Sequence, residues 1–123
     1  MKLEKGMYVR TKNGIIFKYY PCRNNEYDEE LNIYSEWDDD GRNYDCYTIA
    51  NASYNIIDLI DKGDYVNDYK ILEIVKEFKV IVDKLELNTR DGNYYLKQFT
   101  NNEIKTIVTK EVFKANEYRM ETD

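Results

Sequence analysis

The stretch from residue 51 to residue 75 most constrains what this chain can fold into, because it holds the densest apolar run of the sequence. Within it, residues 62–66 (KGDYV) repeat the pattern of residues 5–9 (KGMYV) near the N-terminus. In both copies a glycine bend leads into an aromatic and a β-branched residue, which is a common start for a short strand of a small β domain. We expect the repeat to open two strands, and we expect Ile57, Val66, Ile71 and Ile107 to be buried.

Turn signals divide the rest of the chain into short runs with β-strand character. Asn13-Gly14 predicts a hairpin in which both turn residues have positive φ. Residues 31–37 alternate, with Leu31, Ile33, Ser35 and Trp37 opposite Asn32, Tyr34 and Glu36, so one face is expected to be buried. The predicted strands are residues 7–10, 15–20, 31–37, 44–49, 65–66, 69–75, 79–87, 94–99, 104–108 and 117–120.

Two short helices are expected between these strands. Residues 52–60 place Tyr54, Ile57 and Ile60 at helical spacing, with Ser53 as a cap, although an extended linker is an alternative. Thr109 is the predicted N-cap of a helix over residues 110–115. The sequence therefore predicts a mostly β (β-rich α+β) fold, an SH3-like barrel or small sandwich of short antiparallel strands with one or two short helices. Residues 1–123 are expected to form a single β-rich domain, either as two SH3-like halves or as one barrel with an inserted acidic hairpin.

The net charge of −6 is unevenly distributed along the chain. Residues 1–25 carry six basic residues against Glu4, whereas residues 26–68 carry 13 acidic residues against Arg42 and Lys62. Acidic surfaces are repelled by nucleic acid and by anionic lipid. We therefore expect no direct binding to nucleic acid or membrane, and a partner protein with a basic surface. The sequence does not decide whether the protein forms homo-oligomers.

The functional groups of enzymes and metalloproteins are sparse. Histidine is absent, and the two cysteines, Cys22 and Cys46, lack metal-ligand spacing. No cofactor, metal site or catalytic residue is expected, and the chain is not predicted to be an enzyme. It shows no signal peptide and no apolar run of membrane-spanning length, which predicts a cytoplasmic protein of a bacterial host.

The acidic run over residues 26–40 is the leading candidate for a binding surface. Calcium is excluded there, because an EF-hand spacing would put Tyr47 where a bidentate glutamate is required. The carboxylates could instead imitate phosphates for a basic partner, or form a solvated turn that protects an edge strand. The candidate partner-binding residues are Tyr27, Asp28, Glu29, Glu30, Tyr34, Glu36, Trp37, Asp38, Asp39 and Asp40.

The basic N-terminal hairpin offers an alternative site for a phosphorylated small molecule. Arg10, Tyr19, Tyr20 and Arg23 combine cations with aromatic rings that could stack on a nucleotide. These bases could also simply neutralise the acidic run that follows them.

Three blocks of the sequence resemble small uncharacterised proteins of phages and prophages in low-GC Gram-positive bacteria. The blocks are residues 1–14 (MKLEKGMYVRTKNG), residues 52–60 (ASYNIIDLI) with 63–67 (GDYVN), and residues 104–111 (IKTIVTKE). The resemblance implies an accessory or counter-defence role, and the charge pattern is similar in kind to acidic anti-CRISPR proteins, although no anti-CRISPR motif is matched. The leading expectation is a non-enzymatic inhibitor of a nucleic-acid-dependent defence. The alternatives are a protein that sequesters a defence nucleotide, and a structural or regulatory phage module.

Overall fold

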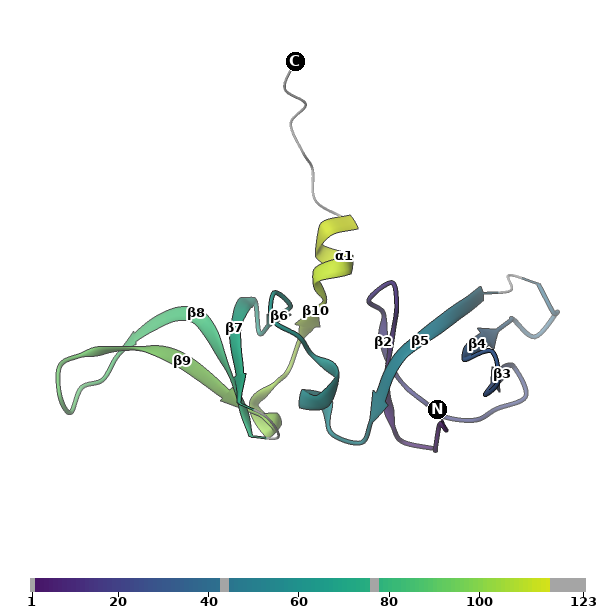
Figure 1. Ribbon diagram of the computed structural model, residues 1–123, viewed down its shortest axis with the longest axis horizontal. Coiled ribbons are helices and arrows are strands. Elements are labelled where there is room, and N and C mark those ends of the chain that lie inside the picture. Colours follow the sequence, from purple (N-terminus) through teal and green to yellow (C-terminus); the bar gives the residue numbers. More distant parts are fainter. Residues whose placement is uncertain (1, 43–44, 76–77, 116–123) are drawn as a thin grey trace, which may run out of the picture. The chain divides into compact units, whose positions relative to one another are not determined.

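The computed structural model describes residues 2–42, 45–75 and 78–115 and is mostly β, with two antiparallel sheets and few short helices (Figure 1). This confirms the predicted fold class, and both sheets are open. The chain divides into two compact units, Met1–Leu59 and Ile60–Asp123, and each is described by itself. Each unit starts with one copy of the repeat: Gly6 and Gly63 have φ of 90° and 92°, and Val9 and Val66 are fully buried. The expectation of one domain over residues 1–123 stays a prediction.

The sheet of the first unit is organised around its longest strand. The strand order is β2-β1-β5-β4-β3, and β5 pairs antiparallel with β1 on one side and with β4 on the other. The core cluster is made of Val9, Tyr34 and Ile49, with further apolar and aromatic side chains packed against it. The strands are β1 (Tyr8–Thr11), β2 (Ile16–Lys18), β3 (Asn25–Asp28), β4 (Ile33–Glu36) and β5 (Asp45–Ser53).

The β1–β2 hairpin forms as predicted, but its turn differs. Gly14 has φ of 89°, whereas Asn13 does not have a positive φ. The Thr11 N–H donates to the Ile15 carbonyl and the Gly14 N–H donates to the Thr11 carbonyl. The closing pair therefore encloses three residues rather than two, and only the last of them needs the left-handed conformation. The prediction of two positive φ values was wrong.

Strand β3 was not predicted, because its sequence is polar and lies inside the acidic run. It pairs with β4 so that Tyr27 faces Tyr34. The expectation that only one face of residues 31–37 is buried is also wrong: the neighbours Tyr34 and Ser35, which alternate between the two faces, are 5% and 7% exposed, whereas Leu31 is 66% exposed. The aromatic ring of Tyr34 has neighbours on both adjacent strands, which alternation within one segment does not show.

The predicted helix over residues 52–60 is a shorter 3-10 helix, η1 (Ile56–Leu59), because β5 continues through Ser53. Ile57 and Leu59 are buried, but Tyr54 is exposed, which corrects its predicted place beside Ile57. The Ser53 hydroxyl accepts the Asn55 N–H and donates to Asp58, so it fixes the turn before the helix.

The second unit follows the predicted strands closely. Its sheet has the order β10-β6-β7-β8-β9, and β6 and β7 are joined by a two-residue turn in which Asn67 and Asp68 both have positive φ (50° and 73°). These values fit the type I′ turn of a tight hairpin. The strands are β6 (Tyr65–Val66), β7 (Tyr69–Val75), β8 (Lys79–Leu87), β9 (Tyr94–Thr100) and β10 (Ile107–Val108).

The end of the second unit is less regular than predicted. The strand expected over residues 104–108 is reduced to Ile107–Val108, the 3-10 helix η2 (Asn101–Glu103) precedes it, and Ile107 is half-buried rather than buried. Helix α1 (Lys110–Ala115) begins as predicted, with the Val112 N–H donating to the Thr109 hydroxyl at 3.3 Å. The strand predicted over residues 117–120 lies outside the described residues.

Candidate protein-binding surface

The acidic run of the first unit is supported by a row of three tyrosines. Tyr27, Tyr34 and Tyr47 lie opposite one another on β3, β4 and β5. Tyr34 packs against Phe17, with ring centroids 4.7 Å apart, and edge-on against Tyr19 at 6.0 Å. The row belongs to the core, so Tyr34 cannot be a contact residue of the surface. This corrects its place among the predicted partner-binding residues.

Burial and nearby carboxylates raise the pKa of all three tyrosines above the ordinary value. For Tyr34 burial is the main cause, followed by the charge of Glu36, which accepts the Tyr34 hydroxyl at 3.2 Å. For Tyr27 burial again comes first, followed by the charges of Glu29 and Asp28. For Tyr47 burial is followed by Asp45 and Glu36. The folded unit therefore favours the neutral phenols.

We expect this row to make the protein sensitive to alkali. The unfolded chain ionises its tyrosines near pH 10, whereas the folded state holds Tyr34 neutral to higher pH. The stability that the neutral phenol confers is complete below about pH 10 and is lost as pH rises above it. Tyr34→Phe should therefore flatten the fall in free energy of unfolding between about pH 10 and pH 12, measured by urea denaturation. Tyr20→Phe, at an exposed tyrosine, is the control and should keep the wild-type profile. A Tyr34→Phe profile as steep as the wild type would contradict this assignment.

Two carboxylates of the acidic run, Asp28 and Asp38, hold its loops through hydrogen bonds to the backbone. The Asp28 side chain accepts the N–H groups of Glu30 and Leu31, at 3.0 and 3.1 Å. The Asp38 side chain accepts the N–H groups of Asp40 and Arg42, at 3.1 and 2.7 Å. Such bonds are typical of turn-forming aspartates. They fix the backbone that carries the other carboxylates.

Asn32 anchors the tip of the β3–β4 hairpin and was not predicted from the sequence. It has φ of 57°, its amide nitrogen donates to the Ile49 carbonyl at 2.6 Å, and its amide oxygen accepts the Tyr27 hydroxyl at 2.7 Å. Asparagine tolerates this conformation better than most residues. The sequence signal that could have identified Asn32 as an anchor was its position in the polar turn after Glu30.

The remaining carboxylates of the run form an exposed acidic surface. Asp39 lies near Arg23, 3.6 Å away, and accepts the Asn24 side-chain amide at 2.6 Å. Within the described residues, no ion pair is recorded for the others. We define the acidic surface as Glu26, Glu29, Glu30, Glu36, Asp39 and Asp40, all of which are exposed.

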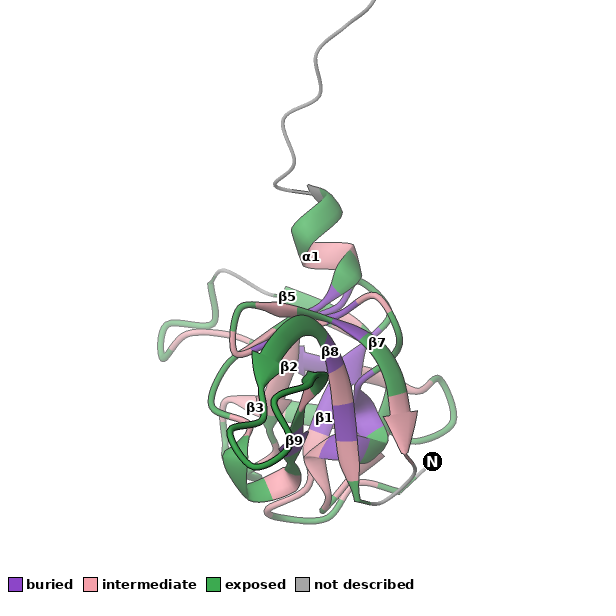
Figure 2. Ribbon diagram, turned by 90° about the vertical axis from the view of Figure 1, so that its left-hand side faces the viewer, coloured by how far each residue is buried: buried purple, intermediate pink, exposed green. Residues whose placement is uncertain are grey.

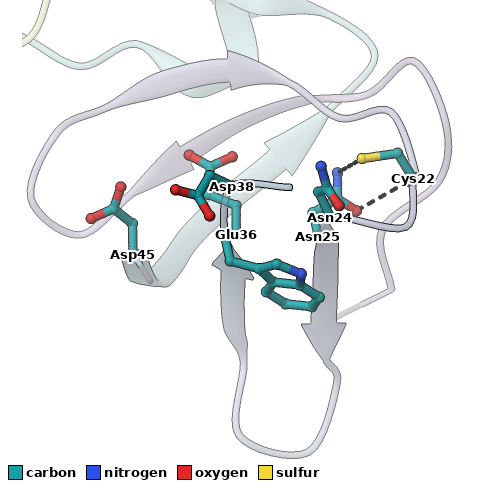
Figure 3. A pocket seen from close by; sticks show the side chains of 7 residues that line it. Cys22, Asn24, Asn25, Glu36, Asp38 and Asp45 are labelled. Carbon is teal, nitrogen blue, oxygen red and sulfur yellow. Dashed lines mark hydrogen bonds between the residues drawn. The ribbon is translucent and has the colours of Figure 1, made fainter. Parts of the chain in front are cut away.

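Beside this surface lies a polar hollow of about 320 Å³ (Figure 3). Glu36, Asp38 and Asp45 line one side, and Cys22, Asn24 and Asn25 line the other. Trp37 completes the lining, and its backbone N–H donates to the Asn24 carbonyl at 3.0 Å. Glu36 and Asp45 face each other directly across β4 and β5, an arrangement of like charges that costs stability. The hollow therefore favours a cationic group over a phosphate.

The alternative ligand residues are not brought together. Arg10 is 3% exposed and donates from Nη1 to the Leu59 carbonyl at 3.0 Å. The ring of Tyr19 packs edge-on against Tyr34, whereas Tyr20 is exposed and lies near Lys18. Arg23 lies by Asp39, as expected if the bases partly neutralise the acidic run. The predicted surface role of Arg10 was wrong. The pairing of β1 with β5 shifts its register between Arg10 and Thr11, and Arg10 is buried beside η1.

Other kinds of site find little support in the described parts of the chain. Residues 2–42, 45–75 and 78–115 contain no group of three or more Cys, Asp or Glu side chains placed to hold a metal ion. Over the same ranges, none of the helices combines the length and apolar character needed to span a bilayer. No protein-family model matches the chain, and neither does any curated protein or solved structure with which it was compared.

Proposed function

We propose that the acidic surface binds a basic protein surface that otherwise holds nucleic acid, so that the protein acts as a non-enzymatic inhibitor. The supporting observation is the array of exposed carboxylates on the β3–β4 hairpin and on the turn that follows β4, which are fixed by Asp28, Asn32 and Asp38. Carboxylates held on a fixed backbone can take the places of phosphate groups, and their charge speeds the encounter with a basic partner.

The biological setting of this proposal is a phage counter-defence role, in which the target is a nucleic-acid-dependent defence protein of the bacterial host. Its support is the resemblance of residues 1–14, 52–60, 63–67 and 104–111 to small phage proteins, together with the charge pattern. The acidic lining of the hollow and the burial of Arg10 favour this proposal over nucleotide sequestration.

The test uses a purified, guide-loaded CRISPR effector from a low-GC Gram-positive host as the basic probe. We expect the wild type to bind it and to compete with its target DNA, with an association rate that falls steeply with salt, because exposed charges are screened over ~8 Å at physiological ionic strength. Glu29→Lys with Glu30→Lys should slow association at low salt by about 10-fold and flatten the salt dependence. Biolayer interferometry across a salt series measures both effects.

The matched control reverses two exposed carboxylates of the second unit, Glu73→Lys with Asp83→Lys, which changes the net charge equally. If both double variants slow association to the same degree, the effect comes from net charge and the acidic surface is not the binding site. Binding that does not compete with target DNA would contradict the inhibitory mechanism. Asp28 and Asp38 are left unchanged because their side chains hold the turns.

A further inference from the structure

The β8–β9 hairpin of the second unit extends well beyond its sheet (Figure 1). Strand β7 pairs with β8 only from Lys79 to Val82, whereas β8 and β9 continue as a two-stranded ribbon. The pairs of this outer part are Leu85 with Leu96, Glu86 with Tyr95, and Leu87 with Tyr94. Every residue from 83 to 96 is exposed, as the green outer part of the hairpin in Figure 2 shows.

One face of this ribbon is entirely apolar or aromatic. Residues that lie directly opposite one another across two strands share a face, so Leu85, Leu87, Tyr94 and Leu96 lie together. They are 61%, 51%, 65% and 38% exposed. The opposite face is mixed: Lys97 and Glu86 form an ion pair at 2.7 Å there, and Tyr95, which pairs with Glu86, donates its hydroxyl to Asp91. We call the four apolar residues the ribbon face.

The ribbon face is large enough to mark an interaction site. At roughly 200 Å² for a large side chain, the four exposed fractions leave about 400 Å² of accessible surface. Contiguous apolar patches of a few hundred Å² on a monomer usually indicate a binding surface. A two-stranded ribbon also has little stability by itself, so packing its exposed face against a partner would stabilise it.

The charged and polar residues of the ribbon indicate which kind of partner it can bind. Residues 83–98 contain three acids (Asp83, Glu86, Asp91) and three bases (Lys84, Arg90, Lys97), so a second ribbon would meet no net repulsion. Neither a strongly basic nor a strongly acidic partner is favoured. The tip, residues 88–93, is polar and carries Arg90 and Asp91, which opposes insertion into a membrane.

We propose that the ribbon face is a homodimer interface, in which two copies pack these faces together about a two-fold axis. One surface would meet its own copy, as in most symmetric dimers. The four side chains of both copies would bury about 800 Å², which is below the ~1,200 Å² at which stable interfaces begin. The dimer is therefore weak and reversible. This inference is independent of the proposed function.

The full chain is tested by sedimentation velocity from about 1 µM to about 1 mM. The mass should rise from 14.8 kDa towards twice that value, and association should hold or strengthen when salt is raised, because screening reduces repulsion between acidic chains. In NMR spectra of the wild type, the methyl signals of Leu85 and Leu96 should shift with concentration, whereas those of Leu31 should not. A chain that stays monomeric at 1 mM would overturn the proposal.

Leu85→Ser with Leu96→Ser should weaken association at least ~10-fold, because both copies lose buried leucines. Leu31→Ser, at a leucine of the first unit that is about as exposed as Leu85, is the control and should associate like the wild type. Far-UV circular dichroism checks that each variant is folded. Equal weakening by both variants would show that the ribbon face is not the dimer interface. Binding of the monomer to phosphatidylcholine vesicles through Leu85 and Leu96 would assign the ribbon face another role.

Discussion

Replacing Arg10 with alanine is expected to lower the free energy of unfolding by about 3 kcal/mol, although Arg10 lies on a hairpin whose sequence suggests a ligand-binding surface. Its side chain is 3% exposed, and Nη1 donates to the Leu59 carbonyl at 3.0 Å. The substitution removes a hydrogen bond from a charged donor, leaves that carbonyl at the end of η1 without this partner, and opens space beside it. Urea denaturation of the variant and the wild type measures the difference.

Two further variants separate the causes of this loss. Arg10→Lys keeps the positive charge but not the planar fork of donors, so we expect only partial rescue. Arg23→Ala is the control, because the Arg23 side chain is 86% exposed and its ion pair with Asp39 is open to solvent. Exposed pairs of this kind contribute at most about 1 kcal/mol. An Arg10→Ala protein as stable as Arg23→Ala would show that the buried bond contributes little.

The contrast between Arg10 and the second unit shows what a sequence can predict. Strands β6 to β9 were predicted within one or two residues, because turn residues such as Asn67 and Asp68 mark their ends. Those signals are local. The burial of Arg10 and Tyr34 depends instead on which strands and helix become their neighbours, and on a register shift between Arg10 and Thr11. No pattern within one segment carries that information.

The candidate surface was predictable to a similar degree. The run of carboxylates is visible in the sequence, but their division into turn-forming and exposed groups follows from backbone geometry around Asp28 and Asp38. The hairpin anchor Asn32 and the contribution of Asp45 to the hollow were missed, because Asp45 meets Glu36 only when β4 and β5 pair. The ribbon face was missed as a surface although both strands were predicted, since alternation alone does not show which face stays uncovered.

The other large effect is expected at Asp64, which is fully buried in the second unit. One of its carboxylate oxygens accepts the Asp61 N–H at 2.7 Å, and the other accepts the Lys110 N–H at 2.8 Å. This side chain therefore joins the turn before β6 to the first residue of α1. Asp64→Ala leaves both backbone donors without this acceptor, at about 1–3 kcal/mol each, so we expect a loss of about 2–6 kcal/mol.

Asp64→Asn keeps one good acceptor and should lose less stability than the alanine variant. Asp83→Ala, at an exposed aspartate of β8, is the control and should change stability by less than about 0.5 kcal/mol. Hydrogen exchange adds a local readout, because the Lys110 amide should lose protection in Asp64→Ala and keep it in Asp83→Ala. Unchanged protection at Lys110 would mean that α1 is held by other contacts. The first copy of the repeat has Met7 at the place of Asp64, so we expect no corresponding carboxylate link in the first unit.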